Sequence, residues 1–467
     1  MIHPDSDSGE LKALASATSD SHAIARHDPY AALRVPAFRR YMIGNFLAIL
    51  GLQMQSAAIG LELYRRTKAP IALALVGLVQ VLPVLGLAVV AGHVADRFNR
   101  RNVIMTAVLI ISAGSAGLAN LSAAHAPVAW MYGCLFFAGL ARAFQQPAKA
   151  SMLPQLVKRR DFPNAVTWNS AAFQLASVLG PAMAGIVISI FKGAAMVFVF
   201  DASFALCFFG ILSTIHYRRR NVEKQPFTAE NLAVGIRFVW RNKVILAASS
   251  LDMFGVLFGA AVALVPIYAD DILKVGNIGY GMMMAAPAAG AVAMSFVLSH
   301  LPPMQHAGKT LLCAVTGFGV ATVVFGFSRW FPLSLAMLFM TGAMDNISVV
   351  VRQSLIQLLT PDEMRGRVSA INGMFISVSN EVGDIESGTV AQAFRSANFS
   401  TASSATISAV TGGAGTLAVV AIIAWLFPQL RGYGKLDSGV AGSSHAPSPS
   451  ETVVADASQS EAPRAAG

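Results

Sequence analysis

Twelve apolar stretches, each long enough to cross a bilayer, follow one another between residues 41 and 428. A transmembrane helix needs roughly 20 mainly apolar residues. Only 12% of the residues are charged, against roughly 25% in an average soluble domain, so a water-soluble surface is excluded. We therefore predict twelve membrane-spanning helices, at residues 41–64, 70–92, 102–122, 127–148, 166–191, 195–216, 245–269, 278–300, 310–328, 331–356, 368–395 and 405–428.

The segments outside the spans predict their orientation. Residues 1–33 are polar and lack the apolar core of a removable signal peptide, so the first span is expected to act as the anchor. With both termini inside, the inner flanking segments hold 21 Lys and Arg and the outer loops hold 7. The positive-inside rule then predicts a bacterial inner-membrane protein with both termini cytoplasmic. This topology explains the net charge of +10 without a nucleic-acid partner.

An internal repeat divides the chain into two halves of six spans. Identical residues recur 203 or 204 positions apart and pair spans 2, 4 and 5 with spans 8, 10 and 11. Chance alignment of glycine-rich helices explains any single match, but not nine on neighbouring offsets. The matches are Tyr64 with Tyr268, Gly77 with Gly281, Pro83 with Pro287, Gly86 with Gly290, Gly139 with Gly342, Ser151 with Ser354, Asn169 with Asn372, Gly180 with Gly383, and Gly185 with Gly388.

The repeat predicts an all-α membrane protein of two six-helix bundles, residues 41–216 and 245–428, related by a pseudo-two-fold axis. Such bundles rock about a site near the bilayer midplane. Residues 217–244 form a cytoplasmic loop between them, with an amphipathic helix expected from Thr228. Its interfacial residues are Leu232, Ile236, Phe238 and Trp240. Residues 1–40 form a cytoplasmic tail, and residues 429–467, rich in Ser, Ala, Gly and Pro, are expected to be a disordered one.

The turn after the second span reads GHVADRFNRR and resembles the signature loop of the major facilitator superfamily. The residues that fit the pattern are Gly92, Asp96, Arg97, Arg100 and Arg101. The resemblance implies a cytoplasmic gate in which Asp96 and Arg101 contact neighbouring helix ends. His300 stands where Asp96 falls in the second half, so the gating charge is expected to be asymmetric.

A second motif, GPAMAG in the fifth span, is similar to the motif of the exporter-type members of this superfamily. Gly180 and Gly185 would permit close helix approach, and Pro181 would kink the helix and free one carbonyl. The segments from Pro147 and from Leu358 resemble the subfamily of the enterobactin exporter and of proteins labelled secretion effectors. This likeness implies export.

Ionisable residues inside spans are costly and so mark candidate functional sites. Arg142 and Asp345 occupy equivalent positions, 203 apart, on spans that the resemblance places around the cavity. They are expected either to face each other there and contact the substrate or a proton, or to have a structural role, as a static ion pair or through contacts to unrelated polar neighbours. Asp252 would also face the cavity, or would cap a neighbouring helix. Asp201 lies on a span that the resemblance places at the periphery, where a structural role is expected.

The eleventh span carries the acids Glu381, Asp384 and Glu386. The first two lie three residues apart on one helical face, and Glu386 points away from them. Two carboxylates in a low dielectric repel each other, so the pair is suited to binding one proton and releasing it when the site opens to the other side. The alternative is that Glu381 or Asp384 pairs with a basic group at the bundle interface. Asp384 replaces Pro181 in the repeat, which predicts specialised function in the second half.

Together these features predict a secondary transporter that exports a small siderophore-like or drug-like molecule in exchange for protons. The alternatives are proton-coupled uptake and a nontransporting sensor of the same fold. An ATP-driven pump is disfavoured, because the GKT triplet at 308–310 has Pro303 where a phosphate loop requires glycine. Enzyme activity is not expected, since the histidines are scattered and no catalytic motif is present.

The expected partners are the lipid bilayer, the small-molecule substrate and protons, and the chain is expected to act as a monomer. No cofactor or metal is expected. Cys134, Cys207 and Cys313 are far apart in sequence and have no metal-ligand or redox spacing, so we interpret them as packing residues.

Overall fold

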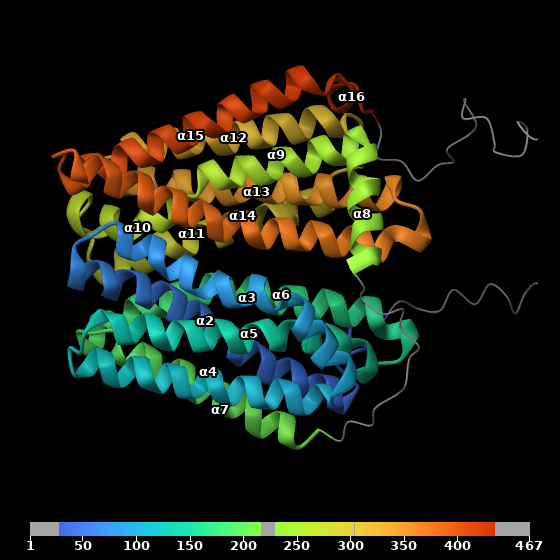
Figure 1. The fold of residues 1–467 in the computed structure, drawn as a ribbon, viewed down its shortest axis with the longest axis horizontal. Coiled ribbons are helices and arrows are strands. Elements are labelled where there is room, and N and C mark those ends of the chain that lie inside the picture. Colours follow the sequence, from blue (N-terminus) through green and yellow to red (C-terminus); the bar gives the residue numbers. More distant parts are fainter. Residues whose placement is uncertain (1–27, 216–228, 303, 435–467) are drawn as a thin grey trace, which may run out of the picture.

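Two helical bundles lie side by side in the computed structural model, which describes residues 28–215, 229–302 and 304–434 (Figure 1). Within these ranges the surroundings of some helical residues also lie outside the description, those of Gly92 and of the Asp96 side chain among them. The first bundle consists of α2 (Pro36–Thr67), α3 (Ile71–Arg97), α4 (Arg100–Ala123), α5 (Val128–Leu156), α6 (Phe162–Phe191) and α7 (Ala195–Ser213), with a 3-10 turn, η1 (Arg159–Asp161), before α6.

The second bundle repeats this arrangement. Its long helices are α9 (Lys243–Gly259), α11 (Gly276–His300), α12 (Ala307–Phe327), α13 (Phe331–Leu359), α14 (Asp362–Ser396) and α15 (Thr401–Leu426), and the short α16 (Pro428–Arg431) follows. Each long helix overlaps one predicted span, and the twelve-helix fold is confirmed. Among the described residues, nine helices are long and apolar enough to cross a membrane. Ile71–Leu87 of α3 is a shorter apolar helix.

The seventh span departs from the continuous helix predicted at residues 245–269. After Gly259, which packs against the Phe318 ring, the chain continues as a 3-10 turn, η2 (Ala261–Leu264), then α10 (Val265–Ile267) and a π-helical turn, η3 (Tyr268–Ile272). Pro266 lacks an N–H and cannot continue the hydrogen-bond ladder of α9. Short π-helical segments often occur at functional sites.

Small residues bring the two bundles together along two equivalent crossings, α6 with α11 and α3 with α14. A Cβ atom added at Gly185 of α6 would lie 2.5 Å from the carbonyl oxygen of Asn277 and 3.0 Å from Cα of Gly281, both on α11. On the other side, a Cβ atom at Gly388 of α14 would lie 2.9 Å from the backbone N of Ala74 on α3. Gly185 and Gly388 are a matched pair of the repeat, so the two crossings follow its symmetry.

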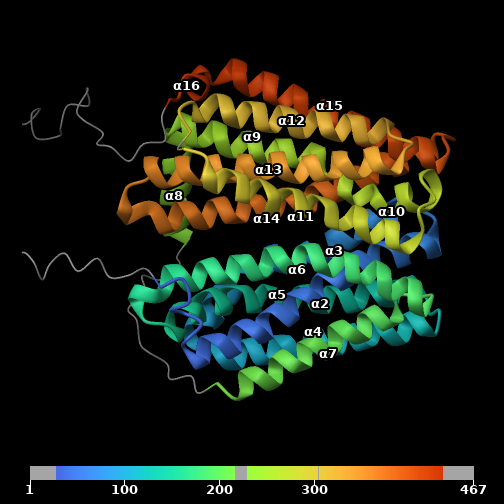
Figure 2. The same ribbon diagram turned by 180° about the vertical axis from the view of Figure 1, so that it is seen from behind.

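A single helix, α8 (Ala229–Arg241), runs across one end of the second bundle (Figures 1 and 2). We call this the α8 end, and the opposite end, where α10 lies, the far end. Val239 is buried among residues of α9, α13 and α14, whereas Ile236 and Trp240 are exposed. The helix thus has one buried and one exposed side, and its place at the membrane interface stays a prediction. Thr228 and the side chain of Leu232 lie outside the described residues.

Candidate functional site

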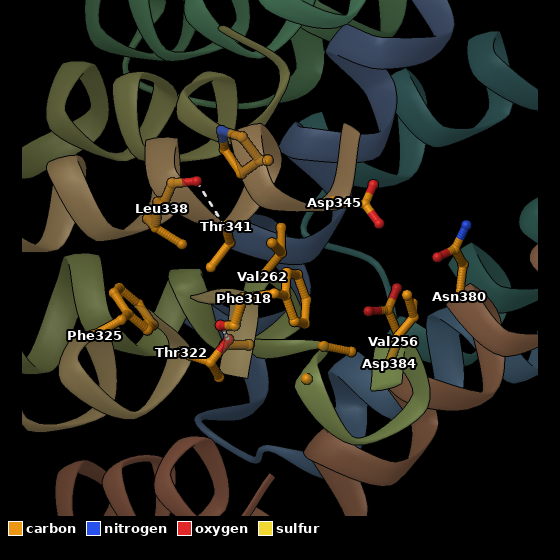
Figure 3. Close-up of a pocket in the computed structure, with 15 residues that line it drawn as sticks. Val256, Val262, Phe318, Thr322, Phe325, Leu338, Thr341, Asp345, Asn380 and Asp384 are labelled. Atoms are coloured by element: carbon orange, nitrogen blue, oxygen red, sulfur yellow. Dashed lines mark hydrogen bonds between the residues drawn. The ribbon is translucent and has the colours of Figure 1, made fainter. Parts of the chain in front are cut away.

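A cavity of about 290 Å³ lies inside the second bundle, among α9, α11, α12, α13 and α14. Its lining is mainly apolar and includes the rings of Phe318 and Phe325. Asp345 of α13 and Asn380 and Asp384 of α14 gather at one end, away from Phe325 (Figure 3). A mostly apolar cavity with a few convergent polar groups is the usual form of a small-molecule site. The cavity is therefore the candidate binding site.

The acid pair of α14 lies where the two bundles meet. A Cβ atom added at Gly77 of α3 would lie 3.4 Å from Oε2 of Glu381 and 3.6 Å from Cβ of Asp384. A glycine at this position lets the helix of the first bundle pass close to both acids. Glu386 lies on the same helix and accepts a hydrogen bond from Ser387 Oγ at 3.3 Å. Glu381 and Asp384 therefore both border the opposite bundle, and Asp384 also lines the cavity.

Asp252 of α9 forms a buried ion pair, with 2.5 Å between its Oδ2 and Nη1 of Arg352 on α13. The two side chains are 3% and 1% exposed. Ser348 donates to Asp252 Oδ1 at 3.3 Å, and Arg352 also donates to Asn372 Oδ1 at 3.4 Å. Asp252 thus has an arginine partner instead of the open cavity or the helix cap expected for it. Asp345 lines a small void beside the pair.

Sequence reasoning missed the role of Arg352, although a signal was present. Offset 203 of the repeat matches Arg352 to Lys149, another cation inside a span. A cation retained in both halves needs a partner within the bundle. In the second half that partner is Asp252.

Arg142 of α5 is bound to amides of its own bundle. Its Nη1 donates to Gln80 Oε1 of α3, and its Nη2 donates to Gln55 Oε1 of α2 at 3.0 Å. Within the described part of the chain, no ion pair joins Arg142 to Asp345. Equivalent positions in the repeat do not bring the two together, because Arg142 finds acceptors on α2 and α3 while Asp345 lines the cavity of the second bundle.

Polar contacts join the bundles at the far end. Arg65 of α2 makes a bidentate ion pair with Asp270 of η3, at 2.8 Å from its Nε and 2.7 Å from its Nη2. The Tyr64 hydroxyl donates to Asp271, and Lys68 lies 3.8 and 3.6 Å from the two acids. These contacts fasten the end of α2 to the π-helical turn, and sequence reasoning did not predict them.

The signature loop after α3 is described only in part. The surroundings of Gly92 and the side chain of Asp96 lie outside the description, and Arg97 is exposed. Arg100 donates to the Ser151 carbonyl at 3.0 Å. Arg101 donates to the Leu212 and Ser213 carbonyls, at 3.0 and 2.5 Å, in the last turn of α7. A cation at a helix C-terminus interacts favourably with the helix dipole.

The GPAMAG segment of α6 makes close contacts on two sides of the helix. Pro181 is buried within the helix. A Cβ atom added at Gly180 would lie 2.5 Å from Gln53 Cβ of α2, inside the first bundle. Gly185, further along the helix, faces α11 of the second bundle. The segment thus joins a contact within one bundle to a contact between the two.

Solved structures of transporters share this architecture. A bacterial homologue of the lysosomal transporter Spinster, in an inward-facing unoccupied conformation, superposes with a TM-score of 0.62 at 12% identity, covering 85% of this chain and 98% of that one. A mutant of the nucleoside transporter NupG superposes with a TM-score of 0.65 at 12% identity, covering 84% and 100%. The fold is that of a major facilitator transporter.

The family model described as transmembrane secretion effector matches residues 27–454, and the chain belongs to that family. The multidrug efflux pump Tap of Mycolicibacterium fortuitum is 25% identical over 68% of this chain and 80% of its own length. The enterobactin exporter EntS of Shigella boydii is 24% identical over 75% and 83%. The resemblance predicted from the loop and the GPAMAG segment is thus confirmed, and the protein is a multi-pass membrane transporter by family and fold.

Proposed function

We propose that the protein exports a small siderophore-like or drug-like molecule across the bacterial inner membrane in exchange for protons. In this proposal the two bundles rock about the cavity and open it alternately to the two sides. The names of two relatives, a multidrug efflux pump and an enterobactin exporter, support export. The lipid bilayer, the exported molecule and protons are the proposed partners of a monomeric chain.

The observation that carries the proposal is the position of Asp384. This carboxylate lines the cavity of the second bundle and also lies against Gly77 of the first. Rocking the bundles apart would change the surroundings of the Asp384 carboxylate as the cavity closes to one side of the membrane and opens to the other. A carboxylate so placed is able to take a proton from one side and return it to the other. Glu381, one turn away, acts with it in the proposal.

The orientation follows from the distribution of charge. The positive-inside rule favours the α8 end as cytoplasmic, because the basic segments between spans cluster there. The far-end contacts of Arg65 and Asp270 would then close the outer side. The two termini would lie in the cytoplasm.

The test is gradient-driven transport by purified protein in proteoliposomes, with ethidium and enterobactin as probes. Asp384→Asn removes the titratable group at nearly constant shape, so concentrative transport driven by a pH gradient should fail. Downhill exchange of the probe should survive. Glu381→Gln should impair coupling in the same direction.

Glu386→Gln is the matched control, because this acid lies on the same helix but accepts its hydrogen bond from Ser387. It should leave gradient-driven transport intact. Full gradient-driven transport in both Asp384→Asn and Glu381→Gln would refute the assignment and move the coupling role to Asp252 or Asp345. Accumulation of probe toward the α8 end would favour uptake.

A further inference from the structure

A chain of hydrogen bonds crosses the first bundle and connects a buried carboxylate to Arg142. Asp201 of α7 is 1% exposed, and its Oδ2 accepts from Ser115 Oγ of α4 at 2.6 Å. Ser115 Oγ in turn accepts from Gln55 Nε2 of α2 at 2.9 Å. Gln55 Oε1 accepts from Arg142 Nη2 of α5 at 3.0 Å. Four helices are therefore linked by side chains alone.

The carboxylate fixes the direction of this chain. The Ser115 hydroxyl has one hydrogen and can donate it either to Asp201 or to the Ile111 carbonyl, at 3.0 Å. A carboxylate is the stronger acceptor, and its bond to Ser115 is the shorter one. With its hydrogen committed to Asp201, Ser115 presents a lone pair to the Gln55 amide nitrogen. The Gln55 oxygen must then face Arg142.

Reversing the Gln55 amide would place its NH₂ group against the guanidinium, donor against donor. Arg142 would then keep only its hydrogen bond to Gln80 among the described residues, because its Nε already has no hydrogen-bond partner there. By accepting from Gln55 Nε2, Ser115 therefore helps to hold the Gln55 oxygen toward the guanidinium. Arg142 also interacts with the charge of Glu381 on α14, in the opposite bundle.

The residues around Asp201 leave space for its carboxylate. A Cβ atom added at Gly51 of α2 would lie 2.5 Å from Asp201 Oδ1, so only glycine leaves room for the carboxylate. Arg142 and Lys149 of α5 are the charged groups that share with Asp201 the lining of a void of about 40 Å³. Within the described residues, the carboxylate thus faces two cations of α5 and the hydroxyl of α4.

We propose that Asp201 is a positioning residue for Arg142, acting through Ser115 and Gln55. The inference rests on the proposed function, in which Arg142 lies on the substrate and proton pathway. It gives the acid of α7, the sixth span, a functional task in place of the purely structural one expected from the sequence.

Ser115→Ala tests the proposal, because it removes the hydroxyl that links Asp201 to Gln55 and leaves Asp201 and Arg142 unchanged. Gradient-driven transport of ethidium should fall by about tenfold, as expected when a contacting group is misplaced. Ser115→Thr keeps the hydroxyl and should restore most of the rate. The matched control is Ser112→Ala, one turn earlier on α4, whose hydroxyl donates to the Ala202 carbonyl of α7 at 3.0 Å. Equal losses in Ser115→Ala and Ser112→Ala would overturn the proposal.

A second background separates positioning from simple packing. In Gln55→Glu the carboxylate accepts from Arg142 whatever Ser115 does, so adding Ser115→Ala should cause no further loss of transport. If Ser115→Ala reduced transport in this background as much as it does in the wild-type protein, Ser115 would act through packing and the proposal would be overturned.

A third measurement does not depend on transport. Butanedione modifies arginine side chains, and mass spectrometry of the purified protein gives the rate at Arg142. Loss of one hydrogen bond should raise that rate by about fivefold in Ser115→Ala, with no change in Ser112→Ala. Equal rates in the two variants would overturn the inference. If the wild-type protein transported neither probe, the proposed function would be refuted. The modification rate at Arg142 would then still decide whether Asp201 positions the guanidinium.

Discussion

Breaking the bidentate ion pair at the far end should shift the protein toward conformations in which that end is open. Arg65 of α2 and Asp270 of η3 belong to different bundles, and their contact exists only while the far ends are together. Their side chains are 35% and 14% exposed, so solvent screening limits the contribution. Exposed pairs contribute about 0.2–1 kcal/mol, and the bidentate geometry favours the upper end. About 1 kcal/mol corresponds to a change of about fivefold in the ratio of closed to open protein.

The assay is pulsed electron paramagnetic resonance between spin labels at the far ends of α4 and α14. Ala123→Cys and Ser396→Cys are exposed attachment sites in a protein whose three native cysteines have been replaced. Asp270→Asn should increase the population at the longer label distance by about fivefold relative to the shorter one.

Glu62→Gln provides the matched control for this experiment. Glu62 pairs with Arg66 at 2.6 Å near the same end, but both residues lie on α2, so the pair does not join the bundles. Its loss should leave the distance distribution unchanged. If Asp270→Asn and Glu62→Gln gave the same distribution, the far-end ion pair would not contribute to closure.

Two further predictions concern packing. Gly185→Ala places a methyl group 2.5 Å from the Asn277 carbonyl oxygen and should reduce transport strongly, whereas Gly193→Ala, which meets no atom within 4 Å, should not; equal transport rates in proteoliposomes would contradict this. Asp252→Leu or Arg352→Met alone leaves half of a buried ion pair and should destabilise the fold by about 3–5 kcal/mol. The double variant Asp252→Leu with Arg352→Met should recover most of that loss. Thermal unfolding in detergent measures the difference, and additive losses would argue against a coupled pair.

The membrane fold could be predicted from the sequence because the length and polarity of each span are local properties. The repeat added the division into two bundles, since glycines such as Gly185 and Gly388 recur where backbones cross. The break after Gly259 was not predicted. Phe318, which packs against Gly259 there, is distant in sequence, and hydropathy does not report on the break.

The candidate site was predicted only in part. Asp345 and Asp384 were identified because a charge inside a span is conspicuous, and both line one cavity. Gln55 and Gln80 carry no charge, so no sequence pattern singled them out as partners of Arg142. The pairing at the far end depends on how two bundles meet, which is a property of the assembled fold. The roles of Gly92 and Asp96 stay predictions, because the surroundings of Gly92 and the side chain of Asp96 lie outside the description.

The most direct test of the central claim is the movement of protons that accompanies transport by the wild-type protein. Proteoliposomes containing a pH-sensitive dye and no imposed pH gradient receive an outward gradient of ethidium or enterobactin. Exchange predicts that flow of the probe in one direction drives protons in the other, so the lumen becomes more acidic as the probe leaves. An ionophore that equilibrates protons should abolish the pH change and accelerate the probe. Flow of the probe at an unchanged lumenal pH, with no response to the ionophore, would contradict proton-coupled exchange.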